Sequence, residues 1–172
     1  ALDYGEAPFW IENRATPIWT ANIAYDMSLF RNDPSLRFDK RYDRQGQDIG
    51  GGEDAIMFRA FLDRGVRIRY RPDMVTLHAV EAWRLTRSYF LKLHYRKGLR
   101  QGQYELPAYE RKILGVPPFM VMQFLRHSTS ALGMLLSRRA GALRQGMNAA
   151  HSLGNLVGYR HRGAVKADEL VK

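Results

Sequence analysis

GGGEDAIMFRAFLDRGVRIRY, which runs from Gly50 to Tyr70, has the clearest local pattern in this chain. Its apolar residues between Ile56 and Phe61 recur at the spacing of one helical face, which predicts a helix over Glu53–Arg64. Two acids occupy the first turn, where the helix dipole favours them, and Gly65 is a natural stop. VRIRY then alternates between apolar and basic residues, so we predict a half-buried strand over Val66–Tyr70.

Further elements are predicted on both sides of this stretch. ANIAYDMSLF (Ala21–Phe30) has mixed apolar spacing and fits a short helix or a strand, and the polar residues 31–52 predict a long loop. MVTLHAV (Met74–Val80) predicts a second strand, and RLTRSYFLKLHYRKG (Arg84–Gly98) predicts a basic amphipathic helix. The apolar stripe of that helix consists of Leu85, Tyr89, Phe90 and Leu93. Strands interleaved with helices predict an α/β fold class.

Charge is distributed unevenly along the 172 residues. Residues 1–81 hold 11 Lys/Arg against 13 Asp/Glu, net −2, whereas residues 82–172 hold 16 against 4, net +12. Such an asymmetry indicates an anionic partner for the second half: a nucleic acid, a phosphate-bearing substrate or a membrane surface. The chain has no cysteine, which excludes a disulfide framework and thiolate metal sites.

The segment Ile113–Gly141 is strongly apolar and ends in basic residues. It contains two prolines, Gln123, Arg126 and His127, and one arginine at mid-bilayer costs on the order of 3 kcal/mol on insertion scales. We therefore interpret it as an interfacial helix or as a helix packed on the domain, rather than as a membrane span. A weaker amphipathic helix is predicted after it.

The Glu53–Asp54 pair allows two interpretations. Acids in a first helical turn commonly only favour the helix terminus. A site is the alternative, because the preceding glycines let a ligand approach the backbone, and His78 follows at the end of a predicted strand. An imidazole beside carboxylates suits a divalent ion or a diphosphate. The sequence has no nucleophile elbow, no phosphate-cradling GxxxxGK[ST] loop, no HExxH motif and no zinc-finger spacing.

Seven features occur in a specific order between Trp19 and Gly98. They are a small-residue-Asn segment in TANIAYD, an FD loop in RFDKRYD, the Gly-rich Glu-Asp pair, the RAFLDRG helix end, the YRPD turn, the strand-terminal His78 and the RLTRSYF helix. This order resembles the C-terminal half of family-2 glycosyltransferases of the GT-A fold. The resemblance implies the acceptor-side half of a GT-A type mixed sheet, followed by C-terminal amphipathic helices.

The resemblance also implies roles for the glycine-acid segment. Asp54 would be the catalytic base that takes a proton from the acceptor hydroxyl, and Glu53 would hold the acceptor or orient the loop. Gly51 and Gly52 would lie against the donor sugar or the acceptor. One well-placed carboxylate can serve an inverting transfer by general base catalysis.

Four further residues complete the implied site. His78 would contact a metal or the diphosphate, and Arg84 the diphosphate. Trp19 and Asn22 would line the acceptor side. A divalent metal, Mg or Mn, is expected in the full-length enzyme, because the leaving diphosphate develops charge.

One departure from the family pattern is informative. The family's N-terminal half carries the nucleotide-binding strands and a DxD motif, and no Asp-x-Asp occurs in this chain. The chain also starts at Ala1 without methionine or a visible signal peptide. We therefore expect a fragment of a longer enzyme that is inactive alone, with a partial catalytic domain over residues 1–100 and a basic helical extension over residues 101–172.

The expected partners are a nucleotide-sugar donor, a saccharide or lipid-linked acceptor and an anionic membrane surface, at a cytoplasmic, peripheral location on the inner membrane face. Two alternatives remain open. One is a non-catalytic remnant that acts as a membrane or scaffold-binding module, which the missing DxD favours. The other is a basic nucleic-acid-binding protein, which the pI near 10.1 favours, although no nucleic-acid-reading motif is present.

Overall fold

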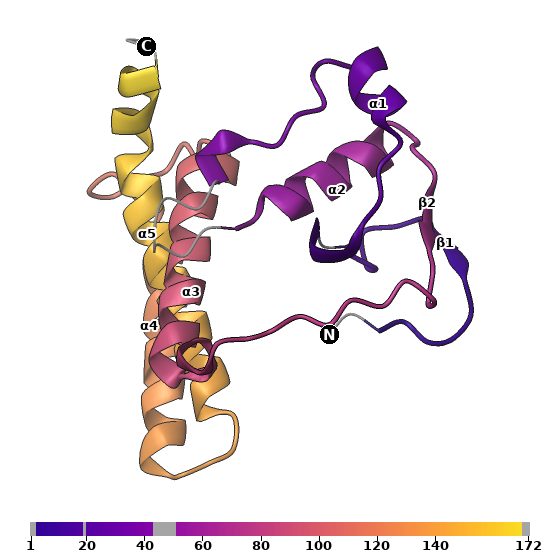
Figure 1. Ribbon diagram of the computed structural model, residues 1–172. Coiled ribbons are helices and arrows are strands. Elements are labelled where there is room, and N and C mark those ends of the chain that lie inside the picture. Colours follow the sequence, from indigo (N-terminus) through magenta and orange to yellow (C-terminus); the bar gives the residue numbers. More distant parts are fainter. Residues whose placement is uncertain (1–2, 19, 43–50, 170–172) are drawn as a thin grey trace. The chain divides into compact units, whose positions relative to one another are not determined.

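The computed structural model describes residues 3–18, 20–42 and 51–169 (Figure 1). The chain divides into two compact units, Ala1–Ala79 and Val80–Lys172. This division falls earlier than the predicted boundary after residue 100, because the basic helix packs with the helices that follow it. Helices and strands are both present, as the α/β prediction requires, and most of the described elements are helices.

The strands of the first unit form a two-stranded antiparallel sheet. β1 (Phe9–Ile11) pairs with β2 (Ile68–Tyr70), with Phe9 opposite Tyr70. The same-face pair Phe9–Tyr70 brings its rings within 5.1 Å, and the Trp10 ring on the other face lies 4.1 Å from the Arg67 guanidinium carbon. The strand predicted from VRIRY is therefore confirmed in a shorter form, and cross-strand aromatic contacts hold it.

The helices of the first unit are short. α1 (Met27–Asn32) begins at Asp26, whose carboxylate accepts a hydrogen bond from the Ser28 amide, and α2 (Glu53–Asp63) confirms the predicted helix. Two 3₁₀ turns, η1 (Thr20–Asn22) and η2 (Lys40–Tyr42), precede α2 along the chain. ANIAYDMSLF thus forms a turn followed by a helix, and no strand.

A small apolar core joins these elements. Leu36, Met57 and Phe61 are buried together, and α2 contributes the last two of them. The Phe61 ring lies 5.7 Å from Tyr25 and 6.2 Å from Phe30, so aromatic side chains fill much of this core. Its position explains why the apolar stripe of α2 could be recognised from sequence: the stripe is the face that the core buries.

The predicted strand over Met74–Val80 is wrong. These residues have no regular secondary structure, and Val75 and Leu77 are exposed, Leu77 by 95%. Alternating apolar residues form a strand only when a neighbouring strand pairs with their backbone, and the described residues supply none for this segment. His78 consequently lies in an extended, exposed segment and not at a strand end.

The second unit is helical (Figure 1). Its 3₁₀ turn η3 (Ala82–Leu85) leads into α3 (Arg87–Arg100), which begins at the Thr86 cap and continues as the π-helical turn η4 (Gln101–Glu105). α4 (Pro118–Leu136) and α5 (Ala142–Glu169) follow. α5 packs against both α3 and α4. The basic helix predicted from Arg84 therefore begins three residues later, and the expected C-terminal helices are present.

Glycines set the distance between α5 and the α3–η4 segment. A Cβ on Gly98 would lie 2.0 Å from the His151 carbonyl oxygen, and one on Gly154 would lie 2.1 Å from the Tyr95 carbonyl oxygen. Gly102 and Gly158 are equally close to the opposite backbone. Each helix thus presents two glycines four residues apart, and the helix backbones pack directly on each other.

Histidines and charged residues surround this crossing. Burial lowers the pKa of His151, and the charge of Lys97 on α3 lowers it further. His94 on α3 and His127 on α4 add to that lowering, whereas the Glu105 carboxylate opposes it. The pKa of His94 is also lowered, by burial and then by Lys97. Both imidazoles are therefore neutral in the folded protein at neutral pH.

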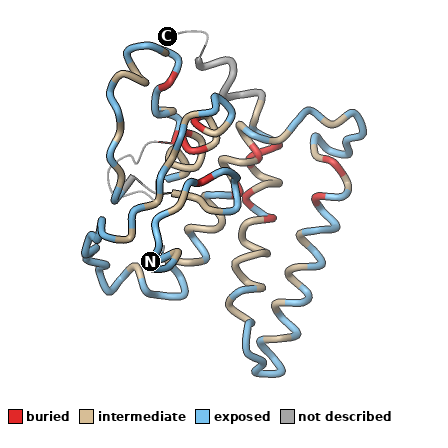
Figure 2. The backbone as a smooth tube through the Cα atoms, turned by 90° about the vertical axis from the view of Figure 1, so that its right-hand side faces the viewer, coloured by how far each residue is buried: buried red, intermediate tan, exposed pale blue. Residues whose placement is uncertain are grey.

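α4 packs on one side only. Its less exposed residues are Met120, Phe124, His127, Ser128, Ala131 and Met134. They recur every three or four residues, which is the spacing of a single stripe, and α5 is the helix that α4 contacts. Figure 2 shows that full burial along α4 is confined to its beginning. Among the described residues, no helix is long and apolar enough to cross a membrane.

Candidate functional site

The glycine pair before α2 adopts a backbone that other residues rarely reach. Gly51 has φ 124° and Gly52 has φ 116°, and Gly52 is the N-cap of α2. A Cβ on Gly52 would lie 3.0 Å from the Tyr42 ring, whereas one on Gly51 would meet no described atom within 4 Å. The Gly51 amide donates to the Tyr42 carbonyl at 3.2 Å, which ties this loop to η2. Gly52 therefore packs against the Tyr42 ring, whereas no described side chain lies against the Cα of Gly51.

Glu53 and Asp54 form the first turn of α2, directly after these glycines. The Glu53 Oε2 and Asp54 Oδ1 atoms are buried and accept no hydrogen bond from any residue that the structure describes. A buried carboxylate oxygen without a donor is costly and uncommon in proteins. The first turn of a helix partly offsets that cost, because the N-terminal end of the dipole favours negative charge. Both oxygens thus keep a hydrogen-bond acceptor that no described residue uses.

Tyr25 is a further residue of this region. Burial raises the pKa of the Tyr25 phenol, and the negative charge of Asp54 raises it further. The ring of Tyr25 packs at 5.5 Å from Phe30 and at 5.7 Å from Phe61, so the core holds it in place. Asp54 therefore lies close enough to Tyr25 for its negative charge to raise the pKa of the phenol.

Asn22 and the segment before His78 are held together. The Asn22 side-chain amide donates to the Met74 carbonyl at 2.6 Å, across 52 residues of sequence. His78 is exposed, and the structure describes no group of three or more His, Asp or Glu residues that could bind a metal ion. The described residues therefore form no metal centre by themselves. Mg or Mn in the full-length enzyme, and His78 as a metal or diphosphate contact, remain predictions.

Arg84 belongs to the second unit, so its position relative to Asp54 is not described. Within that unit its guanidinium donates to the Tyr89 hydroxyl at 3.2 Å and lies 4.0 Å from the Glu81 carboxylate. It also lies 6.0 Å from the Trp83 ring centroid. These contacts hold Arg84 at the start of α3, and its predicted role at a diphosphate is untested.

One predicted site residue lies outside the described part of the chain, and two tyrosines near the site were not predicted. Trp19 lies outside the described residues. Tyr42, by contrast, was not singled out from the sequence, although its buried ring packs against Gly52. A tyrosine three residues after an FD pair carries no periodic signal, so only its contact with the glycine reveals it. Tyr25 was missed for the same reason.

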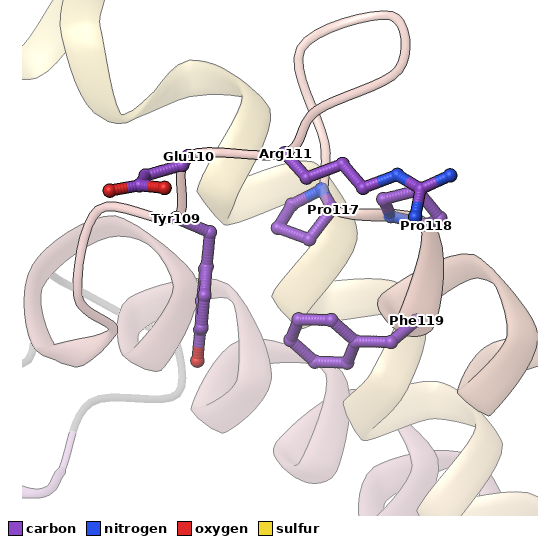
Figure 3. Close-up of a pocket in the computed structure, with 6 residues that line it drawn as sticks. All are labelled: Tyr109, Glu110, Arg111, Pro117, Pro118 and Phe119. Atoms are coloured by element: carbon purple, nitrogen blue, oxygen red, sulfur yellow. The ribbon is translucent and has the colours of Figure 1, made fainter.

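The second unit contains a separate pocket of about 430 Å³ (Figure 3). Its walls are the residues Tyr109, Glu110, Arg111, Pro117, Pro118 and Phe119. The Tyr109 and Phe119 rings meet edge to face at 5.1 Å, and the Tyr109 amide donates to the Tyr159 hydroxyl at 2.9 Å. Apart from Glu110 and Arg111 the walls are aromatic or proline. The pocket lies at the start of α4 and contains none of the predicted site residues.

Comparisons with known proteins identify no relative: no family model, no curated protein and no solved structure matches the chain.

Proposed function

We propose that this chain is the acceptor-side part of an inverting glycosyltransferase that uses a nucleotide-sugar donor. The observation that carries the proposal is the buried Asp54 Oδ1, which has no described donor and directly follows two glycines of positive φ. Such a carboxylate oxygen can accept a proton, and glycines without side chains beside it let a ligand approach the backbone.

In the proposed reaction Asp54 accepts the proton of the acceptor hydroxyl. The acceptor oxygen forms a bond to the anomeric carbon as the bond from that carbon to the diphosphate oxygen breaks. The nucleoside diphosphate leaves with the electron pair, and the configuration at the anomeric carbon inverts. No step is assigned to a metal ion, because the described residues do not form a metal site.

The remaining assignments follow from the surroundings of Asp54. Glu53 precedes it in the same turn and would bind an acceptor hydroxyl through its own buried oxygen. Asn22 holds the segment Met74–Val80 near η1, and we propose that this exposed apolar segment pairs with a strand of the donor-binding half. The acceptor would be a saccharide or a lipid-linked saccharide at the inner membrane face.

The test is an Asp54→Asn variant of the longest protein that contains this chain, assayed for release of nucleoside diphosphate with acceptor present. Loss of a general base lowers turnover by about 10²–10⁴-fold, so we expect a fall in this range. Asp63→Asn is the matched control, because Asp63 lies at the other end of α2 in an exposed ion pair with Arg14. Equal turnover of the two variants would refute the base assignment.

A further inference from the structure

The turn before α4 exposes apolar residues. Ile113 and Val116 form an isolated antiparallel bridge, which closes a tight turn around Leu114 and Gly115. Leu114 is 88% exposed and has φ 52°, a backbone that a branched apolar residue adopts only at a cost. Two basic residues, Arg111 and Lys112, directly precede the turn. A basic, strained turn thus presents leucine to the solvent.

α4 also exposes apolar residues on the side that faces away from α5. The apolar residues on the side opposite the α5-packed stripe are Met122, Leu125, Leu132 and Leu136, and all four are exposed. Thr129 is an exposed polar residue of the same side. Their spacing of three, seven and four residues places them on one helical face. Gln123, Arg126 and Ser130 form a polar edge beside it. We call the turn at Leu114 together with these four residues the α4 face.

Charge identifies the partner of the α4 face. Between Arg111 and Asp168 the sequence contains nine Lys or Arg residues and no Asp or Glu. Among those whose side chains are described, seven are exposed: Arg111, Lys112, Arg126, Arg138, Arg139, Arg144 and Arg160. A second copy docked on the α4 face would bring like charges together, whereas an anionic surface would neutralise them. Apolar residues rimmed by cations are the pattern of helices that lie in a membrane interface.

We propose that the α4 face binds the surface of an anionic lipid bilayer, with α4 parallel to the membrane plane and the Leu114 turn inserted among the acyl chains. Arg126 reaches the headgroups from the polar edge of α4, and Arg138 and Arg139 do so from the turn after it. The inference gives the proposed glycosyltransferase a defined membrane-facing surface. It depends on no residue of the Asp54 region.

The test compares two double variants of the 172-residue chain in sedimentation with vesicles. Leu125→Glu with Leu132→Glu places two carboxylates on the α4 face. Gln123→Glu with Ser130→Glu places two carboxylates, also seven residues apart, on the polar edge. The charge change is identical, so only the location differs. Far-UV circular dichroism verifies that both variants are as helical as the wild type.

We expect the wild-type chain to sediment with phosphatidylcholine vesicles that contain phosphatidylglycerol and to remain in solution with pure phosphatidylcholine. The α4-face variant is expected to partition at least about tenfold more weakly than the polar-edge variant, because charged side chains are costly in the acyl region. Equal partitioning of the two variants would overturn the proposal. So would a wild-type dimer that binds no vesicles and dissociates in the α4-face variant, because a second copy would then be the occupant.

A fluorescence measurement distinguishes insertion from surface attraction. The chain has no cysteine, so Met122→Cys and Ser88→Cys each give one labelling site for an environment-sensitive dye. Met122 lies on the α4 face, and Ser88 is an exposed residue of α3. We expect a blue shift with anionic vesicles for the label at position 122 and none at position 88, and the reverse would refute the assigned orientation. No sugar donor or acceptor is present in either experiment, so failure here leaves the Asp54 test unaffected.

Discussion

Replacing Gly154 by alanine tests the close backbone contact between α3 and α5 in the second unit. The new Cβ would lie 2.1 Å from the Tyr95 carbonyl oxygen and 2.7 Å from the Leu99 amide nitrogen. Ordinary contact begins at 3.4 Å, so α5 and α3 must separate locally by about 1.3 Å. The obstructing atoms belong to a helix backbone and cannot rotate away. Overpacking of this kind costs about 1–3 kcal/mol, and the upper end applies here.

Alanine also has a favourable effect, because it is a better helix former than glycine by about 1 kcal/mol. The net expectation for Gly154→Ala is therefore a loss of about 2 kcal/mol in the free energy of unfolding. For a unit of this size such a loss corresponds to a fall of roughly 10 °C in Tm. Urea unfolding of the 172-residue chain, followed by circular dichroism at a helical wavelength, measures the change directly.

Gly133→Ala is the matched control for this substitution. Gly133 is also helical, on α4, but a Cβ there would meet no described atom within 4 Å. Only the propensity term remains, so we expect stability to rise by about 0.5–1 kcal/mol. If Gly154→Ala were as stable as Gly133→Ala, the close α3–α5 crossing would be refuted.

Three further substitutions probe the first unit and His151. Gly52→Ala should lower the free energy of unfolding by roughly 2 kcal/mol and Gly51→Ala by about 1 kcal/mol. Both glycines have positive φ, but a Cβ would meet the Tyr42 ring only at Gly52. Equal losses in urea unfolding would contradict that contact. The pKa of His151 in the folded protein lies below the usual value near 6.5. The stabilisation that neutral His151 contributes is therefore complete above pH 6.5 and is lost as the pH falls below the folded-state pKa. His151→Gln should therefore reduce the fall in the urea midpoint between neutral and mildly acidic pH, and an unchanged fall would exclude His151 as its source.

Local sequence patterns correctly predicted the helix and the strand that each bury one face. The helix over Glu53–Arg64 is present because its apolar stripe packs into the core around Phe61, and VRIRY forms a strand because β1 lies beside it. The same reasoning failed at Met74–Val80. That segment is also rich in apolar residues, but strand pairing depends on a second strand that a local pattern cannot supply.

Part of the candidate site could be predicted from the sequence. Glu53 and Asp54 were identified by the glycines before them, and the structure shows buried oxygens on both. Tyr42 and Tyr25 were not identified, because their positions depend on the folding of the long loop and the core. The glycine crossing was missed for a related reason. Its glycines stand four residues apart in two segments, yet sequence alone does not say which helices meet.

The crossing of α3 and α5 has a consequence for the order of folding. α4 and α5 are joined by a short turn over residues 137–141, so their contact closes only a small loop. The contact of Gly98 with His151 closes a loop of about fifty residues and demands two preformed helix backbones. We therefore expect α4 and α5 to assemble first as a helical hairpin and α3 to dock last. Gly154→Ala should then accelerate unfolding far more than it slows folding.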